Sequence, residues 1–91
     1  MEAKIWNKNG WLNETNSTEL KNTFNELLRL SGFDILNFQE HYFVPQGYTA
    51  IWLLGESHLA IHTFPESKKS YIELSSCNED YFLYFIANCG F

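Results

Sequence analysis

Hydrophobic residues recur along the chain with two periods, and the first of them predicts a helix. Four apolar residues have the spacing of one helix face, namely Leu20, Phe24, Leu27 and Leu28. Asn16 can cap this segment, and Glu19 stands three residues later, which is the spacing of a capping box. Gly32 can take the left-handed conformation that ends a helix. The pattern therefore predicts a helix over residues 17–30.

The second period is the alternation that is typical of strands. Runs dense in β-branched, aromatic and aliphatic residues cover 4–12, 33–43, 48–54, 59–64 and 71–75. We expect a bend at Gly10 in the first run, a turn at Pro45-Gln46-Gly47 and a polar hairpin loop over 65–70. Residues 80–87 predict a second helix, with Asn78 or Asp80 as its cap.

The order of these elements predicts the fold class. A strand and a helix are followed by three to four strands and a second helix. Strands joined by short turns pair antiparallel, and helices on one face of such a sheet make a two-layer α+β sandwich. By element order, the nearest alternative is a ferredoxin-like arrangement. We expect residues 1–91 to form one domain.

Composition and charge restrict the partners of this domain. The chain is 45% hydrophobic and 18% aromatic, a large apolar load for 91 residues, so we expect a homodimer. Its net charge is −5, with no basic run, which argues against nucleic-acid binding. No stretch reaches the roughly 20 apolar residues of a membrane span. The N-terminus lacks the hydrophobic region of a signal peptide, so we expect a cytoplasmic protein with free thiols at Cys77 and Cys89.

The break between the third and fourth predicted strands carries the candidate chemistry. Ser57 follows Glu56 at a tight turn, where strain can press the Ser57 hydroxyl against the Glu56 carbonyl. Attack there gives an ester, and elimination and hydrolysis then leave a pyruvoyl group. A histidine side chain can act as an acid or a base in such a step, which makes His62 the candidate. Alternation places three residues on each face of this strand: His58, Ala60 and His62 on one, and Leu59, Ile61 and Thr63 on the other. The alternative is an unreactive turn serine with two strand histidines.

Three segments around this turn resemble a known family. Residues 41–49 (HYFVPQGYT) and 71–77 (YIELSSC) flank the longest motif, ESHLAIHTFPE over 56–66. Together they resemble the prokaryotic-type S-adenosylmethionine decarboxylases, which cut their own chain at Glu-Ser and convert the serine into a pyruvoyl group. The similarity is tight from about Phe38 to Cys77 and looser over the first strand and helix. It implies a self-cleaving enzyme that is made as a zymogen.

The resemblance implies a role for each catalytic position. The bond between Glu56 and Ser57 is the cleavage site, and Ser57 becomes the covalent pyruvoyl cofactor. His62 helps to break the ester, and Thr49 stands where the family has a serine that assists processing. Cys77 donates the proton that quenches the carbanion after carbon dioxide leaves. Without the resemblance, Cys77 would be a small buried residue.

The resemblance also implies how substrate binds. Glu66 binds the ribose hydroxyls of S-adenosylmethionine, and Phe43 and Phe64 lie near the nucleoside. The substrate amine forms a Schiff base with the pyruvoyl carbonyl, which accepts the electrons of decarboxylation without a metal. The product enters spermidine and other polyamine biosynthesis. Each of these side chains also has a purely structural alternative. Glu66 is then a solvated acid in a loop, and Phe43 and Phe64 are core residues.

Several departures from the family keep other functions open. Phe64 replaces a tryptophan, Gly55 a common serine, and Asn78 the usual glycine after the cysteine. Family members continue past the position of Phe91 with the rest of the second helix and at least one more strand. The chain is then a minimal form, or takes that strand from elsewhere, or has drifted in activity. The alternatives are a pyruvoyl-dependent arginine or ornithine decarboxylase and an uncleaved, non-catalytic homologue with a regulatory or binding role.

Overall fold

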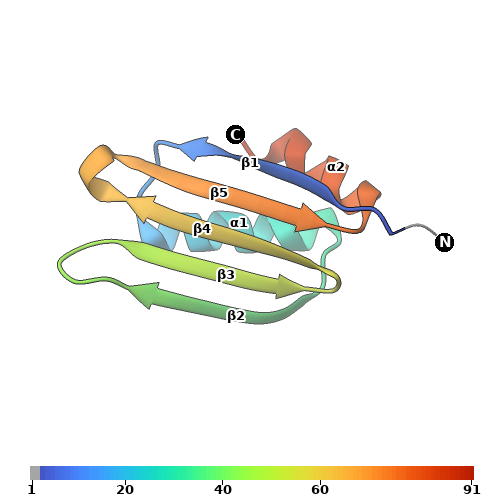
Figure 1. The fold of residues 1–91 in the computed structure, drawn as a ribbon, viewed down its shortest axis with the longest axis horizontal. Helices are drawn as coiled ribbons and strands as arrows, with labels where there is room; N and C mark the ends of the chain where they lie inside the picture. Colours follow the sequence, from blue (N-terminus) through green and yellow to red (C-terminus); the bar gives the residue numbers. More distant parts are fainter. Residues whose placement is uncertain (1–2) are drawn as a thin grey trace.

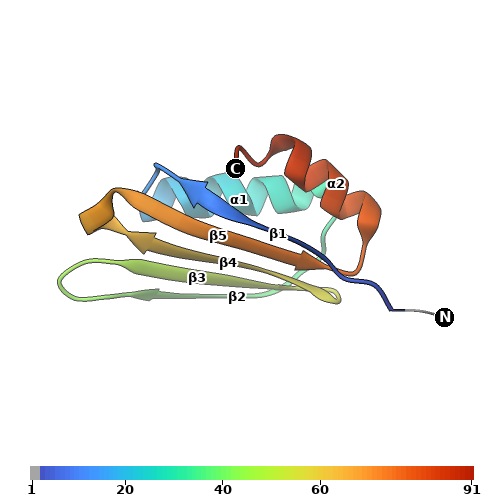
Figure 2. The ribbon, with the colours of Figure 1, turned by 45° about the horizontal axis from the view of Figure 1, so that its top comes forward.

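The structure, a computed structural model that describes residues 3–91, consists of one sheet with two helices on one of its faces (Figures 1 and 2). The elements in chain order are β1 (Trp6–Leu12), α1 (Ser17–Ser31), β2 (Ile35–Tyr42), β3 (Tyr48–Leu54), β4 (Ser57–Phe64), the 3-10 turn η1 (Pro65–Ser67), β5 (Lys69–Ser76) and α2 (Glu79–Asn88). The predicted two-layer α+β sandwich is confirmed. Within the described residues, no helix is long and apolar enough to cross a membrane.

All neighbouring strands of the sheet run antiparallel, in the order β1-β5-β4-β3-β2. Strands β2 to β5 form a meander because their connections are too short for a parallel crossover. The first strand closes the sheet by pairing with β5 rather than with β2. This meander, which has no helix between β3 and β4, rules out the ferredoxin-like alternative.

The helix ends form as their sequences predict. The Asn16 side chain accepts a hydrogen bond from the Glu19 N–H at 3.0 Å, and Gly32 ends α1 with a φ of 105°. Asn78, rather than Asp80, caps α2 by accepting from the Tyr81 N–H at 3.0 Å. That cap fixes where α2 begins, directly after β5, and so joins the end of β5 to the helical layer.

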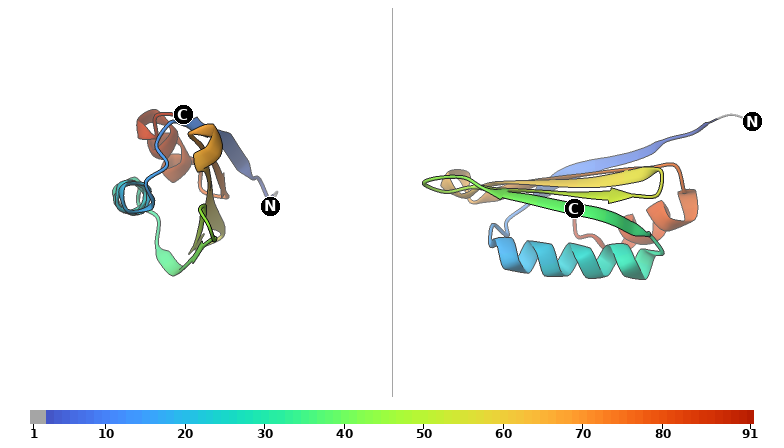
Figure 3. Two further views of the ribbon diagram at one scale, coloured as in Figure 1. Left: turned by 90° about the vertical axis from the view of Figure 1, so that its left-hand side faces the viewer. Right: turned by 90° about the horizontal axis from the view of Figure 1, so that it is seen from below.

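Alternation along the strands separates a buried face from an open one. On β4, Leu59, Ile61 and Thr63 are buried, whereas His58, Ala60 and His62 face the other way, as predicted. The buried side chains of the three central strands form the core with α1 and α2: Tyr48, Ala50, Trp52, Leu54, Leu59, Ile61, Ile72 and Leu74. Figure 3 shows both helices on this side of the sheet. Nothing within residues 3–91 covers the opposite face, where Ile51 and Leu53 are 47% and 52% exposed.

The bend that we expected at Gly10 is absent, because Gly10 stays in register opposite Ile72 within a continuous strand. The absence of a side chain at Gly10 instead allows the ring of Phe91 to approach the strand closely. A Cβ atom at this position would lie 2.8 Å from a ring carbon of Phe91, which packs against the core beside Phe24 and Phe85. The β5 strand also begins at Lys69, two residues earlier than its alternating run predicts, because the pairing with β4 extends to Phe64.

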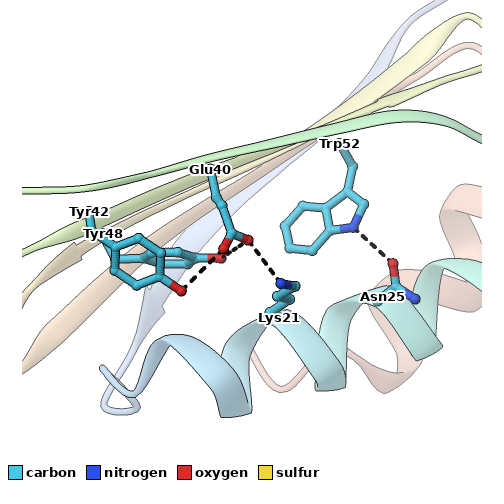
Figure 4. Close-up of polar contacts among 6 residues, drawn as sticks. All are labelled: Lys21, Asn25, Glu40, Tyr42, Tyr48 and Trp52. Atoms are coloured by element: carbon cyan, nitrogen blue, oxygen red, sulfur yellow. Dashed lines mark hydrogen bonds and ion pairs between the residues drawn. The ribbon is translucent and has the colours of Figure 1, made fainter.

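A polar cluster ties α1 to β2, which is an edge strand of the sheet (Figure 4). The Glu40 carboxylate lies 3.1 Å from Lys21 Nζ and accepts hydrogen bonds from the hydroxyls of Tyr48 at 3.1 Å and Tyr42 at 3.2 Å. Burial by itself raises the pKa of Glu40, but these donors outweigh it and hold that pKa below its usual 4.5. Burial and the Glu40 carboxylate raise the pKa of Tyr48, so this hydroxyl remains a donor.

The lowered pKa of Glu40 predicts a pH-dependent contribution to stability. The contribution is fully present above the unfolded-state value of 4.5 and is lost as pH falls through the lower folded-state pKa. In urea unfolding, Glu40→Gln should therefore be less stable than wild type at pH 7, with a difference that shrinks in acid. Glu26→Gln is the matched control, since its partner Arg29 is exposed and such pairs contribute little. A difference for Glu40→Gln that does not change with pH would contradict this account.

Candidate active site

The tight turn between β3 and β4 holds the predicted cleavage site. Glu56 has a φ of 56°, a left-handed conformation that non-glycine residues adopt at some energetic cost. Ser57 begins β4 opposite Ser76 of β5, and its side chain is buried on the helix-facing side of the sheet. The Ser57 hydroxyl donates to Ser76 Oγ at 2.9 Å. The peptide bond before Ser57 thus follows a strained residue and precedes a fixed hydroxyl group.

Cys77 lies at the same end of the sheet. It follows Ser76 directly, between β5 and α2, and is an exposed free thiol. The pairing of Ser57 with Ser76 brings the backbone of Cys77 next to the beginning of β4. Ser57 and Cys77, which are 20 residues apart in the sequence, are therefore brought to one end of the fold by the β4–β5 hairpin.

His62 lies in a second group of polar and aromatic side chains on the open face. It pairs with Thr49 across β3 and β4, and Thr49 Oγ1 lies 3.0 Å from His62 Nδ1. On the other side, the imidazole stacks on Tyr71 of β5, with ring centroids 6.5 Å apart and an interplanar angle of 20°. Trp11 in turn contacts Tyr71 edge-on at 5.3 Å. These contacts fix the ring of His62, and the hydroxyl of Thr49 helps to orient it.

A cavity of about 370 Å³ opens beside this imidazole. It is lined by Phe43, Gln46, Gly47, Thr49, His62, Thr63, Phe64 and Glu66. Phe43 and Phe64 are half-exposed, at 50% and 40%. This excludes the alternative that the two rings are part of the hydrophobic core. Aromatic faces beside a carboxylate suit a ligand that has a flat ring and hydroxyl groups. Apart from Glu56, Ser57 and Cys77, every predicted site residue lines this cavity, namely Phe43, Thr49, His62, Phe64 and Glu66.

The structure does not bring Ser57 and His62 together within one chain. Figure 1 shows the β3–β4 turn and the end of β5 at one end of the sheet, with the β2–β3 and β4–β5 connections at the other. The two side chains are five residue steps apart, which is about 16 Å along β4. They also face opposite sides of the sheet, since Ser57 is on the helix-facing side and His62 is on the open side.

Sequence reasoning missed three of the contacts that shape these groups. Ser76 touches Ser57, Tyr71 stacks on His62, and Gln46 lines the cavity. The first two follow from the register of β5 against β4, which the alternation of single strands does not specify. Gln46 is part of the predicted turn, but nothing in the turn sequence indicates which way its side chain lies.

Comparison with known proteins finds relatives of this chain. The chain is 38% identical over 60 residues to the S-adenosylmethionine decarboxylase proenzyme of Prochlorococcus marinus, a match that covers 66% of this chain and 49% of that protein. The proenzyme of the same name from Oceanobacillus iheyensis is 32% identical over 78 residues, or 85% of this chain and 60% of that protein. The chain thus spans about half the length of several curated relatives that it matches.

The fold and the family model agree with these relatives. The crystal structure of the adenosylmethionine decarboxylase from Aquifex aeolicus superposes with a TM-score of 0.63 at 20% identity, covering 77% of this chain and 62% of that one. At this identity, the superposition establishes a shared fold. The family model described as S-adenosylmethionine decarboxylase matches residues 11–88, which is most of the chain. The chain therefore belongs to the S-adenosylmethionine decarboxylase family.

Proposed function

We propose that this chain cleaves itself between Glu56 and Ser57 and acts as a pyruvoyl-dependent decarboxylase of S-adenosylmethionine. The observation that carries the proposal is the turn before β4, where Glu56 is held at a φ of 56° and the next residue presents a buried, hydrogen-bonded hydroxyl. A strained peptide beside an oriented nucleophile is prepared for an acyl shift. Membership of the family supports the same reaction.

The cleavage is a sequence of balanced steps on this chain's own atoms. Ser57 Oγ forms a bond with the carbonyl carbon of Glu56, the C–N bond breaks, and the hydroxyl proton passes to the released amine. Loss of the Ser57 Cα proton then expels the Glu56 carboxylate and leaves a dehydroalanine. Water hydrolyses that residue, releases ammonia and leaves a pyruvoyl group at the new N-terminus. Removal of the Ser57 Cα proton, which breaks the ester, requires a base, for which His62 is our candidate.

The separation of Ser57 from His62 supports a homodimer whose sites are shared. The distance of about 16 Å along one strand is too long for proton transfer within a chain. In a two-fold dimer, the Thr49–His62 group of one copy can lie beside the cleavage turn of the other. The exposed apolar residues Ile51 and Leu53, on the same open face as His62, are a surface that a second copy can cover.

The same composite site suits decarboxylation. The pyruvoyl group supplies a carbonyl that accepts electrons when carbon dioxide leaves. Cys77, exposed beside the start of β4, can deliver a proton to the carbon that loses the carboxylate. In the cavity, Phe43 and Phe64 can hold the adenine ring, and Glu66 can accept hydrogen bonds from the ribose hydroxyls. The product would be a precursor of spermidine.

Intact mass spectrometry of the purified protein tests the proposal. Wild type should give two fragments, residues 1–56 and 57–91, with the second carrying a pyruvoyl N-terminus. Ser57→Ala should remain one chain, because it lacks the attacking oxygen. Cleaved protein should then release carbon dioxide from S-adenosylmethionine and not from arginine or ornithine. A folded wild type that stays uncut would overturn the proposal in favour of a non-catalytic homologue.

A further inference from the structure

We propose that Ser76 is a positioning residue for self-cleavage, which holds the Ser57 hydroxyl in its reactive orientation. This inference rests on the proposed function. The two serines are directly paired across β4 and β5, and both side chains are buried on the helix-facing side. Their hydroxyl groups lie 2.9 Å apart. No other partner contacts the Ser57 hydroxyl among the hydrogen bonds of residues 3–91.

The hydrogen bonds of Ser76 determine the direction of this contact. Its hydroxyl donates to the Asn78 carbonyl at 3.3 Å, and its oxygen accepts from the Asn78 N–H at 3.0 Å. A serine hydroxyl has one proton and two lone pairs. Because a carbonyl can only accept, the proton of Ser76 is used by Asn78, and its remaining lone pair accepts the proton of Ser57. The proton and both lone pairs of the Ser76 hydroxyl are therefore all used, and one lone pair accepts from Ser57.

This direction prepares Ser57 for attack. With its O–H bond fixed toward Ser76, both lone pairs of Ser57 Oγ remain free for the adjoining carbonyl carbon of Glu56. Without Ser76, the hydroxyl can rotate among its staggered positions and can donate to a carbonyl instead. The left-handed conformation of Glu56 and the fixed hydroxyl of Ser57 thus act on the two sides of the same peptide bond. Ser76 itself gains and loses no bond in the reaction.

Ser76 is held in place because its hydrogen-bond partner Asn78 is itself fixed. Asn78 is also the cap of α2, where its side chain accepts from the Tyr81 N–H at 3.0 Å. The cap of α2 therefore fixes Asn78, and Asn78 in turn fixes the hydroxyl of Ser76. The Ser76 side chain is 1% exposed, so water does not compete for its lone pairs.

The test compares the rates of fragment formation after synthesis of wild type, Ser76→Ala, Ser76→Thr and Ser70→Ala, by mass spectrometry. Ser76→Ala should slow cleavage on the order of 10- to 100-fold, the cost of a misplaced reacting group. Ser76→Thr keeps the hydroxyl and should restore most of the rate. Ser70→Ala is the matched control, because Ser70 is a buried serine on the same strand and face whose hydroxyl donates to the Glu14 carbonyl. It should cleave as wild type does.

Hydroxylamine, which cleaves esters, identifies the affected step. Because Ser76 acts before the ester forms, hydroxylamine should not release additional fragments from Ser76→Ala. If folded Ser76→Ala were cleaved at the same rate as wild type, the inference would be overturned and the proposed function would remain intact. Equal slowing by Ser70→Ala, or no recovery in folded Ser76→Thr, would also overturn it. An uncut wild type would instead contradict the proposed function itself.

Discussion

Cys77→Ala is expected to cleave between Glu56 and Ser57 at the wild-type rate and yet to lose decarboxylation by about 10²–10⁴-fold, the usual contribution of a general acid. The two outcomes differ because the proposed role of Cys77 follows the formation of the pyruvoyl group. Its thiol is exposed at the end of β5, where the β4–β5 pairing brings it beside the start of β4. Assays with labelled S-adenosylmethionine measure the loss, and mass spectrometry detects protein inactivated by misplaced protonation and transamination.

The second cysteine provides the control for this prediction. Cys89 is buried at the end of α2, with its thiol directed to the Ile86 carbonyl in the helical layer. Cys89→Ala removes a thiol of the same kind and should turn over substrate as wild type does, once the folded fraction is measured. Wild-type turnover by Cys77→Ala would mean that Cys77 only packs. The proposed catalytic apparatus would then be wrong at one of its central positions.

His62→Ala is expected to stop the chain at the ester, before a pyruvoyl group can form. The proposed role of the imidazole is to help break the ester, and its contact with Thr49 at 3.0 Å fixes the ring for that role. Denatured His62→Ala should run as one chain, and hydroxylamine should cut it at Glu56. His41→Ala is the control, since His41 pairs with Thr49 from the other side but does not line the cavity. Pyruvoyl formation by His62→Ala at the wild-type rate would refute the role.

The local features of this fold could be predicted from the sequence. The cap at Asn16, the left-handed Gly32 and the two faces of β4 each depend on residues that are close together in the chain. The same alternation already implies that Ser57 and His62, five residues apart, point to opposite faces. Alternation over residues 58–63 alone leaves out Ser57 and so does not show that the serine and the histidine are on opposite faces.

Long-range features could not be predicted in the same way. The contact of Ser57 with Ser76, the clamp of Glu40 on Lys21 and Tyr48, and the fit of Phe91 against Gly10 all depend on register and on helix placement. Side chains that alternate correctly are compatible with several registers, and only the assembled core selects one. The chemistry of Ser57 and His62 was suggested by their place in the sequence and by the family resemblance. The roles of Cys77 and the cavity residues came from the resemblance alone, and all of these roles remain predictions.

A mixed dimer tests the central claim, that each site is built from two copies, most directly. Ser57→Ala and His62→Ala chains with different tags are produced together, and the dimer that carries both tags is isolated. If each site is built from two copies, this dimer contains one complete site, in which Ser57 of the His62→Ala chain meets His62 of the other. We predict that the His62→Ala chain is cleaved with a pyruvoyl end in this dimer and nowhere else, while the Ser57→Ala chain stays whole. An uncut mixed dimer, or wild-type protein that is cleaved while sedimenting as a monomer, would contradict the account.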